Sequence, residues 1–296
     1  MATPETTGYI AAFMSGFLFA GSDVLVRKAV TRLTPRAMLA ISLLVGTPLL
    51  AIFAILSGDP LPPAKAILAY ILAGMFNFVA GRLLFYLAVS ALGAATASVL
   101  TSPTILVSAF LAAILLGEPL SLPLVAGLSL TTLGVFLASF RPSGVELQGV
   151  NYKLGLLSGI ASVFMFASSA ILVRYAGVQG ASPLWGTTIS YASALPIVLS
   201  YTWRDLSRSM RYKNTLGTAL KAAIAAAAIV ALAQMSRYIA LTDLPVARAV
   251  ILISLFPIHT IYLSRIAGEA LMEEVRINHV LGGALGVIGI IVAYTA

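Results

Sequence analysis

The chain has 296 residues, of which 60% are hydrophobic and 9% are charged, and it contains no cysteine. A soluble domain carries about 25% charged residues, so this composition excludes that class, and the many apolar residues exclude a disordered chain. The formal net charge of +8 does not indicate a nucleic-acid partner, because the basic residues lie mostly in short loops between apolar segments, where they orient membrane helices.

Apolar runs of roughly 20 residues, long enough to cross a bilayer, alternate with turn residues along the whole chain. They predict an all-α integral membrane protein with ten transmembrane helices, located in the cell membrane. The predicted segments are 8–28, 36–56, 66–89, 95–116, 122–140, 154–174, 184–203, 218–240, 246–266 and 276–294.

The second half of the chain repeats the first half in order, with a residue offset that drifts only slightly. Residues 19–29 match 166–176 at an offset of 147, Gly8 matches Gly155 at 147, Tyr86 and Ala88 match Tyr238 and Ala240 at 152, Gly117-Glu118 matches Gly268-Glu269 at 151, and Gly127 and Gly134 match Gly282 and Gly289 at 155. Because each repeat holds an odd number of helices, we expect two inverted five-helix repeats, residues 1–144 and 145–296. Inverted repeats are the architecture of secondary transporters.

The repeated residues resemble the EamA-type family of ten-helix carriers in the drug/metabolite transporter superfamily. The matching features are the Phe-Ala-Gly-Ser…Val-Arg pattern at 19–27 with Pro35 after it, the run 94–98 with Pro103, the Gly117-Glu118 pair, and the glycine-rich closing helix of each half. The resemblance implies a central cavity lined by predicted helices 1, 3, 4, 6, 8 and 9, with helices 5 and 10 outside it.

We expect a secondary transporter that moves small metabolites, with amino acids favoured and export the favoured direction. Two alternatives stay open: a carrier of phosphorylated or nucleotide-linked sugars or of lipid phosphate, and a membrane scaffold or enzyme that does not transport. The sequence has no phosphate-binding loop, no nucleophile elbow and no metal-ligand cluster, so we expect neither enzymatic activity nor a cofactor or metal.

The charge distribution and the family resemblance predict opposite orientations. Thirteen Lys and Arg residues lie at odd-numbered loops and three at even-numbered loops. The positive-inside rule therefore places both termini outside the cell, whereas the resemblance implies cytoplasmic termini.

Arg82 is the leading candidate for substrate binding, because a charged side chain inside a span costs about 2.5–3.5 kcal/mol and is retained for a reason. It lies in the third predicted helix, roughly 7 Å beyond the centre, and its repeat counterpart is Gln234. A guanidinium binds carboxylate or phosphate through two parallel hydrogen bonds. We expect Arg82 to bind an anionic group of the substrate; the alternative is a structural bond to helix-end carbonyls.

Three further ionisable residues lie in the predicted spans. Arg237 is near the loop end of the eighth helix, where its side chain reaches the interface, so a structural role is favoured over substrate binding. Asp23 precedes Arg27 by four residues, a spacing that suits a local ion pair, with proton coupling as the alternative. His259 is a second coupling candidate, or else a packed and hydrogen-bonded side chain.

Neutral polar side chains on predicted helices 3, 4 and 8 complete the candidate binding set. They either orient a ligand in the cavity or bond neighbouring helices to one another. The set comprises Asn77, Tyr86, Thr101, Ser102, Gln234 and Tyr238.

The expected partners are an anionic small molecule and membrane lipid. A face of small residues at Gly282, Gly286 and Gly289 suits either a dimer contact or internal packing, so both a monomer and a homodimer stay open.

Overall fold

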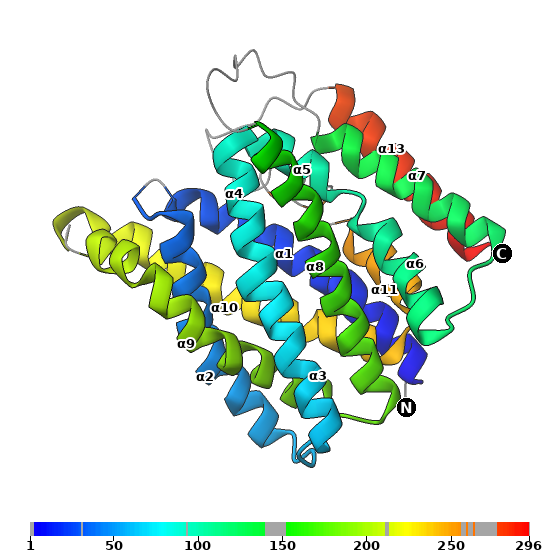
Figure 1. Cartoon of the computed structure of the whole chain (residues 1–296), viewed down its shortest axis with the longest axis horizontal. Helices are drawn as coiled ribbons and strands as arrows, with labels where there is room; N and C mark the ends of the chain where they lie inside the picture. The colour runs from blue at the N-terminus through cyan, green and yellow to red at the C-terminus, as the bar shows by residue number, and fades with distance from the viewer. Residues whose placement is uncertain are drawn as a thin grey trace.

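The computed structural model describes residues 3–30, 32–92, 94–139, 152–210, 213–255, 259, 263 and 277–295. Within these ranges the regular structure is helical and contains no strand (Figure 1). This confirms the predicted all-α class.

The first half begins with two helices whose starts are fixed by the same local chemistry. Thr3 and Thr34 each accept a backbone hydrogen bond from the first turn, and a proline follows each of them, a combination that favours helix initiation. The helices of this half are α1 (Pro4–Ala29), α2 (Pro35–Leu56), α3 (Ala64–Gly74), the π-helix η1 (Met75–Gly81), α4 (Arg82–Leu92), α5 (Ala94–Thr101), α6 (Thr104–Leu116) and α7 (Leu122–Ser139).

The second half contains longer helices. They are α8 (Tyr152–Val178), α9 (Pro183–Met210), α10 (Lys213–Asp243), α11 (Val246–Ile253) and α13 (Ile277–Tyr294). Pro48 and Pro196 lie inside α2 and α9, which continue past them. Pro257 is outside the described residues.

Three predicted segments differ from the observed helices. The segment predicted at 66–89 runs from Ala64 to Leu92 and contains a π-helix in its middle. The segment predicted at 95–116 is broken at Ser102 and Pro103 into α5 and α6, because proline lacks the backbone N–H that would continue the helix. In the segment predicted at 246–266, α11 ends at Ile253 and a turn follows at Ser254 and Leu255.

The packing of the helices follows the two-fold relation that inverted repeats require. Helix α1 packs along α10, and its repeat counterpart α8 packs along α3, η1 and α4. Helix α2 packs on its counterpart α9, and α7 packs on its counterpart α13 at one edge of the bundle (Figure 1). Each contact between halves therefore recurs with the two repeats exchanged.

Glycines at the α7–α13 contact show the same relation at the level of single residues. A Cβ built on Gly134 would lie 2.5 Å from the Gly282 carbonyl oxygen, and one on Gly282 would lie 2.5 Å from the Gly134 carbonyl oxygen. The repeat counterparts Gly127 and Gly289 face each other in the same reciprocal way. The small-residue face of the last helix is thus used for packing inside the molecule.

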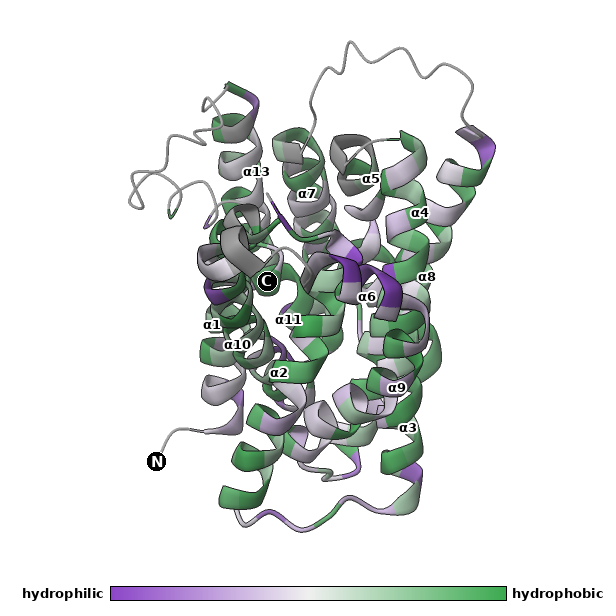
Figure 2. Ribbon diagram, turned by 90° about the vertical axis from the view of Figure 1, so that its left-hand side faces the viewer, coloured by the Kyte–Doolittle hydropathy of each residue, from purple (hydrophilic) through white to green (hydrophobic). Residues whose placement is uncertain are grey.

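The outer surface is apolar enough to face lipid. Six of the described helical stretches are long and apolar enough to cross a membrane by length and composition. Large side chains such as Leu56, Ile114 and Leu122 are more than three-quarters exposed, and Figure 2 shows hydrophobic colour over most of the helices. Such a surface is stable in hydrocarbon and unstable in water.

Candidate functional site

Two arginines from opposite repeats approach each other inside the bundle. Arg82 begins α4, directly after the π-helix, and Arg237 lies on α10. Arg237 is close enough to Arg82 to feel its positive charge. Arg82 also interacts electrostatically with Tyr191 of α9, so helices of both repeats surround the pair.

The direction of the helices explains how the two side chains meet. Ala64 and Asp243 are the ends of α3 and α10 that lie beside the chain termini. Arg82 lies roughly 27 Å from Ala64 and Arg237 roughly 9 Å from Asp243 along the axes. The Cα–Cβ bond leans toward a helix N-terminus, so Arg82 leans back toward the termini and Arg237 leans away from them. Both side chains point into the space between.

Five polar side chains in this region have buried atoms without a hydrogen-bond partner among the described residues. We call these five residues the arginine cluster. The unpaired atoms are Nδ2 of Asn77, Nε of Arg82, the hydroxyl of Tyr191, Oε1 of Gln234 and Nη1 of Arg237.

Buried polar atoms are nearly always hydrogen-bonded, so a group of unpaired ones indicates a place for a ligand or ordered water. Asn77, Gln234 and Tyr191 are 5%, 2% and 0% exposed. Their unpaired atoms therefore cannot all be satisfied by bulk solvent. Arg82 and Arg237 are each partly buried, which leaves space beside the rest of their side chains.

The π-helix sets the position of Arg82. Arg82 caps the π-helix, and its backbone N–H donates to the Val79 carbonyl oxygen. Asn77 lies in the same π-helix, about one turn before Arg82. On α10, Gln234 and Arg237 are three residues apart and share a face. Asn77 with Arg82 and Gln234 with Arg237 therefore form two pairs, one from each repeat.

Tyr238 is a packing residue rather than a member of the cluster. Its hydroxyl donates to Ser190 Oγ at 2.9 Å, and its ring stacks on Tyr70 with ring centroids 6.1 Å apart. Ser190 in turn donates to the Tyr70 carbonyl oxygen at 2.6 Å. This set uses the donor hydrogen of the Tyr238 hydroxyl, so Tyr238 offers a ligand only its hydroxyl oxygen as an acceptor.

The remaining neutral candidates lie in different settings, and of these Tyr86 is the one placed beside the cluster. The Tyr86 hydroxyl donates to the Pro35 carbonyl oxygen at 3.3 Å, and Tyr86 also feels the charge of Arg82. The Ser102 hydroxyl donates to Val99 within its own turn at 2.7 Å. Thr101 and Ser102 sit at the α5–α6 break, so their role in binding stays a prediction.

The two coupling candidates lie on or against α1. The ring of His259 packs edge-on against Phe13 and Phe17, with centroids 5.0 and 5.8 Å away, which is a structural setting. Asp23 lies on α1, and the side chain of its predicted partner Arg27 is outside the described residues. Proton coupling through either residue stays a prediction.

An ion pair closes the end of the bundle where α1 begins and α13 ends, which we call the termini face. Arg174 Nε of α8 donates to Glu118 Oε1 at 2.9 Å, and Arg174 also donates to the Thr242 carbonyl oxygen at 2.6 Å. The other carboxylate oxygen of Glu118 accepts from the Val246 backbone N–H at 2.7 Å, at the start of α11. One carboxylate thus joins the end of α6 to α8 and α11 of the second repeat.

Further contacts between repeats lie at the same face. Asp59 accepts from the Ser182 hydroxyl at 2.6 Å, and its carbonyl oxygen accepts from the Trp185 indole at 3.0 Å. Glu5 pairs with Arg248 at 3.2 Å in an exposed setting. The described structure is therefore held together on the termini-face side of the arginine cluster.

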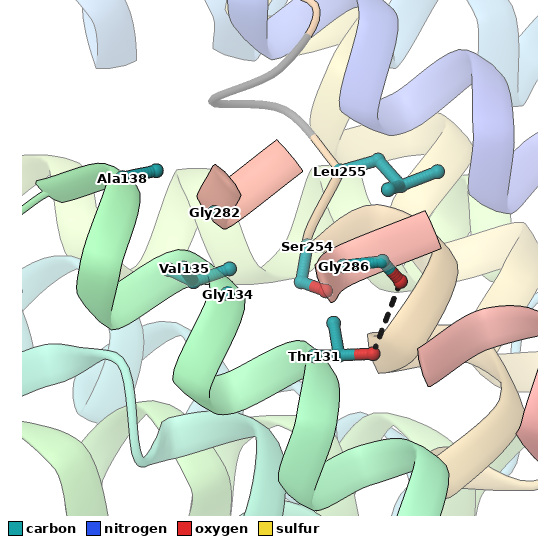
Figure 3. A pocket seen from close by; sticks show the side chains of 8 residues that line it. All are labelled: Thr131, Gly134, Val135, Ala138, Ser254, Leu255, Gly282 and Gly286. Atoms are coloured by element: carbon teal, nitrogen blue, oxygen red, sulfur yellow. Dashed lines mark hydrogen bonds between the residues drawn. The ribbon is translucent and has the colours of Figure 1, made fainter. Parts of the chain in front are cut away.

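A small pocket between α7, α13 and the end of α11 lies apart from this chemistry. Figure 3 shows that Thr131 and glycines line it, and that Thr131 Oγ1 donates to the Gly286 carbonyl oxygen at 3.5 Å. None of its lining residues is charged, so it offers nothing with which to hold an anionic ligand.

Tyr191 and the Arg174–Glu118 pair were not among the residues singled out from the sequence. The available signal for Tyr191 was its place directly after three polar residues, Thr187, Thr188 and Ser190, within an otherwise apolar helix. For Glu118 it was the repeated Gly-Glu pair, which marks a fixed carboxylate in a chain with only ten acids.

Comparison with known proteins decides the family. The EamA-like transporter family matches residues 6–140 and 153–295, one match for each repeat. The chain belongs to the EamA-like transporter family. It is therefore a multi-pass membrane protein of a family whose members transport small molecules and are not enzymes.

The fold also matches a solved structure. A chain titled "Crystal structure of protein" superimposes with a TM-score of 0.77 over 98% of this chain and 99% of that chain, at 17% sequence identity. At this identity the likeness shows the fold alone. No curated protein matches this EamA-like chain.

Proposed function

We propose that this chain is a secondary carrier of small metabolites that bear an anionic group, and that it works by alternating access around the arginine cluster. The observation that supports this most is the set of five unpaired buried polar atoms where the two repeats meet. Substrate sites of inverted-repeat carriers lie between the repeats near the membrane centre.

Arg82 is the proposed anion-binding residue. Its Nε is buried and has no partner in the described part of the chain, so binding an anion there replaces no existing bond. A guanidinium fits both carboxylate and phosphate. The sequence favours amino acids moved outward, with phosphorylated sugars as the alternative, and the two positive charges of the arginine cluster favour the alternative.

Uptake into proteoliposomes tests the proposal. The full chain is reconstituted and supplied with a panel of labelled amino acids, sugar phosphates, dicarboxylates and neutral metabolites. We expect saturable flux for anionic members, with at least about tenfold loss in Arg82→Ala, because a charge-assisted hydrogen bond contributes about 1.5–3 kcal/mol. Arg82→Lys should retain part of the flux because it keeps the charge.

Arg204→Ala is the matched control. Arg204 is exposed on α9, and its substitution removes one positive charge, as Arg82→Ala does. Saturable flux that survives Arg82→Ala with unchanged apparent affinity would overturn the role of Arg82. Absence of saturable flux for the whole panel would overturn carriage of small anions and favour a scaffold or enzyme.

A further inference from the structure

The arginine cluster carries two positive charges from opposite repeats. Arg82 and Arg237 interact electrostatically with each other. Each also has a buried, unpaired guanidinium nitrogen among the described residues. Like charges in a partly buried region repel each other unless an anion lies between them.

No carboxylate of the described residues forms an ion pair with either arginine. The ion pairs between described residues lie elsewhere in the molecule. They are Arg36 with Asp205, Arg174 with Glu118, and Arg248 with Glu5. Asp59 accepts from Ser182 instead. Among the described residues, the two positive charges of the cluster therefore have no matching negative charge.

The neutral members of the cluster add mainly hydrogen-bond donors. Asn77 Nδ2 and the Tyr191 hydroxyl are unpaired donors, and Gln234 Oε1 is an unpaired acceptor. A ligand that satisfies this set has several acceptor oxygens and one donor hydrogen.

We infer that the arginine cluster binds a small dianion, and that the chain exchanges one dianion for another instead of returning empty. The inference rests on the proposed carrier function and names its substrate class. A phosphate monoester and a short dicarboxylate share two negative charges and several acceptor oxygens. An amino acid does not carry this charge, because its ammonium group offsets its carboxylate. A polyol phosphate such as glycerol phosphate also supplies the donor hydrogen for Gln234 Oε1, which succinate lacks.

Exchange follows from the cost of closing an empty site. Alternating access requires an occluded state in which water is largely excluded from the cluster. Two unpaired guanidinium groups in that state cost much more than two groups neutralised by a dianion. The loaded carrier therefore changes conformation readily and the empty one does not.

Counter-exchange in proteoliposomes tests the inference. Vesicles are prepared empty or preloaded, and uptake of labelled glycerol phosphate, succinate, lactate and alanine is measured. We expect uptake of the two dianions to rise about ten- to a hundredfold on preloading with a dianion, as the loss of charge-assisted bonds predicts. Comparing the uptake of glycerol phosphate with that of succinate shows whether the two negative charges of the substrate come from a phosphate monoester or from a dicarboxylate.

Arg237→Gln supplies the decisive variant, because it reduces the cluster to one positive charge. We expect its preference to change from dianions to lactate and its dependence on preloading to fall. Arg248→Gln is the matched control, since Arg248 lies in an exposed pair with Glu5. Arg237→Lys, which keeps the charge, should restore dianion preference if the variant folds.

A binding measurement covers the case in which Arg237→Gln reconstitutes poorly. Succinate or glycerol phosphate should raise the melting temperature of the detergent-solubilised wild-type chain, and lactate should not, because a ligand that binds only the folded state stabilises it. Equal uptake of dianions by empty and preloaded vesicles, or dianion preference retained in Arg237→Gln, would overturn the inference. If lactate or alanine shows saturable flux without preloading, the carrier proposal stands and only the dianion inference fails.

Discussion

Tyr191 and Tyr238 are both fully buried tyrosines, and they differ in what their hydroxyl groups contact. The Tyr238 hydroxyl donates to Ser190, whereas the Tyr191 hydroxyl has no partner among the described residues. The ring of Tyr191 packs edge-on against Phe78, with centroids 4.7 Å apart, and fits against Gly46. Packing thus holds the ring while the hydroxyl stays available to a ligand.

Comparing the two tyrosines gives a prediction in which the stability of the chain and its apparent affinity for substrate change separately. Tyr238→Phe should lower the free energy of unfolding by about 1 kcal/mol, the usual contribution of one hydrogen bond, and leave apparent substrate affinity unchanged. Tyr191→Phe should leave stability unchanged or slightly raised and weaken apparent affinity several-fold. Melting temperature in detergent and uptake kinetics measure the two quantities. An equal loss of stability in both variants would contradict the assignment.

Sequence reasoning reached the charged members of the site more easily than the aromatic one. Arg82, Gln234 and Asn77 stand out because polar groups in an apolar run are costly. Arg237 was also noticed, but α10 continues to Asp243, beyond its predicted end, so the residue lies deeper than its predicted place at the interface. Tyr191 gave no comparable signal, because a tyrosine in an apolar helix fits ordinary packing equally well.

At the scale of elements, the contact between α7 and α13 depends on glycine. A Cβ on Gly134 would lie 2.5 Å from the Gly282 carbonyl oxygen and 2.7 Å from the Gly286 backbone nitrogen. Backbone atoms cannot move aside as a flexible side chain does, so any larger residue forces the two helices apart.

Gly134→Val should therefore destabilise the chain by about 1–3 kcal/mol or more, the range for overpacking. Gly217→Val is the matched control, because Gly217 is also helical and a Cβ there meets nothing within 4 Å. Thermal unfolding in detergent checks both variants. Similar melting temperatures for the two would show that the α7–α13 contact tolerates separation.

The π-helix is the element that the sequence did not predict. Its residues, Met75–Gly81, read as an unbroken apolar helix, and nothing in their composition marks an extra residue per turn. The broken helix at Pro103 was easier to anticipate, because the missing N–H is a property of proline itself. Local chemistry thus predicts a break, whereas a π-turn depends on contacts such as that between Gly81 and Phe166.

At the scale of the whole molecule, the Arg174–Glu118 pair favours the conformation closed at the termini face. The two side chains are 16% and 10% exposed, so water screens the pair only partly. Since Glu118 also accepts from the start of α11, opening this face breaks several charge-assisted bonds at once.

Glu118→Gln should shift the carrier toward a conformation open at the termini face. The native chain has no cysteine, so a single Ser190→Cys reports accessibility at a position that is 0% exposed. We expect its labelling by a membrane-impermeant maleimide to rise about tenfold in Glu118→Gln, since a charge-assisted bond contributes about 1.5–3 kcal/mol.

Glu5→Gln is the control at the same face, because its pair with Arg248 is exposed and such pairs contribute little. A similar rise in labelling with Glu5→Gln, or none with Glu118→Gln, would show that this ion pair does not govern the opening.

The repeat, and with it the overall architecture, was predictable from sequence because many matched residues keep their order. Orientation was not, because the charge count and the family resemblance disagree. A cysteine in place of the exposed Ser57, on the termini face, settles it in intact cells: labelling from outside agrees with the charge count, and protection agrees with the resemblance.

Arg174 and Glu118 have repeat counterparts, Arg27 and Glu269, at offsets of 147 and 151. Glu269 and the side chain of Arg27 are outside the described residues. The sequence nevertheless carries the same arginine and glutamate in both repeats. Because inverted repeats exchange roles between the two sides of the membrane, we expect Glu269→Gln to bias the protein toward the opposite resting state from Glu118→Gln.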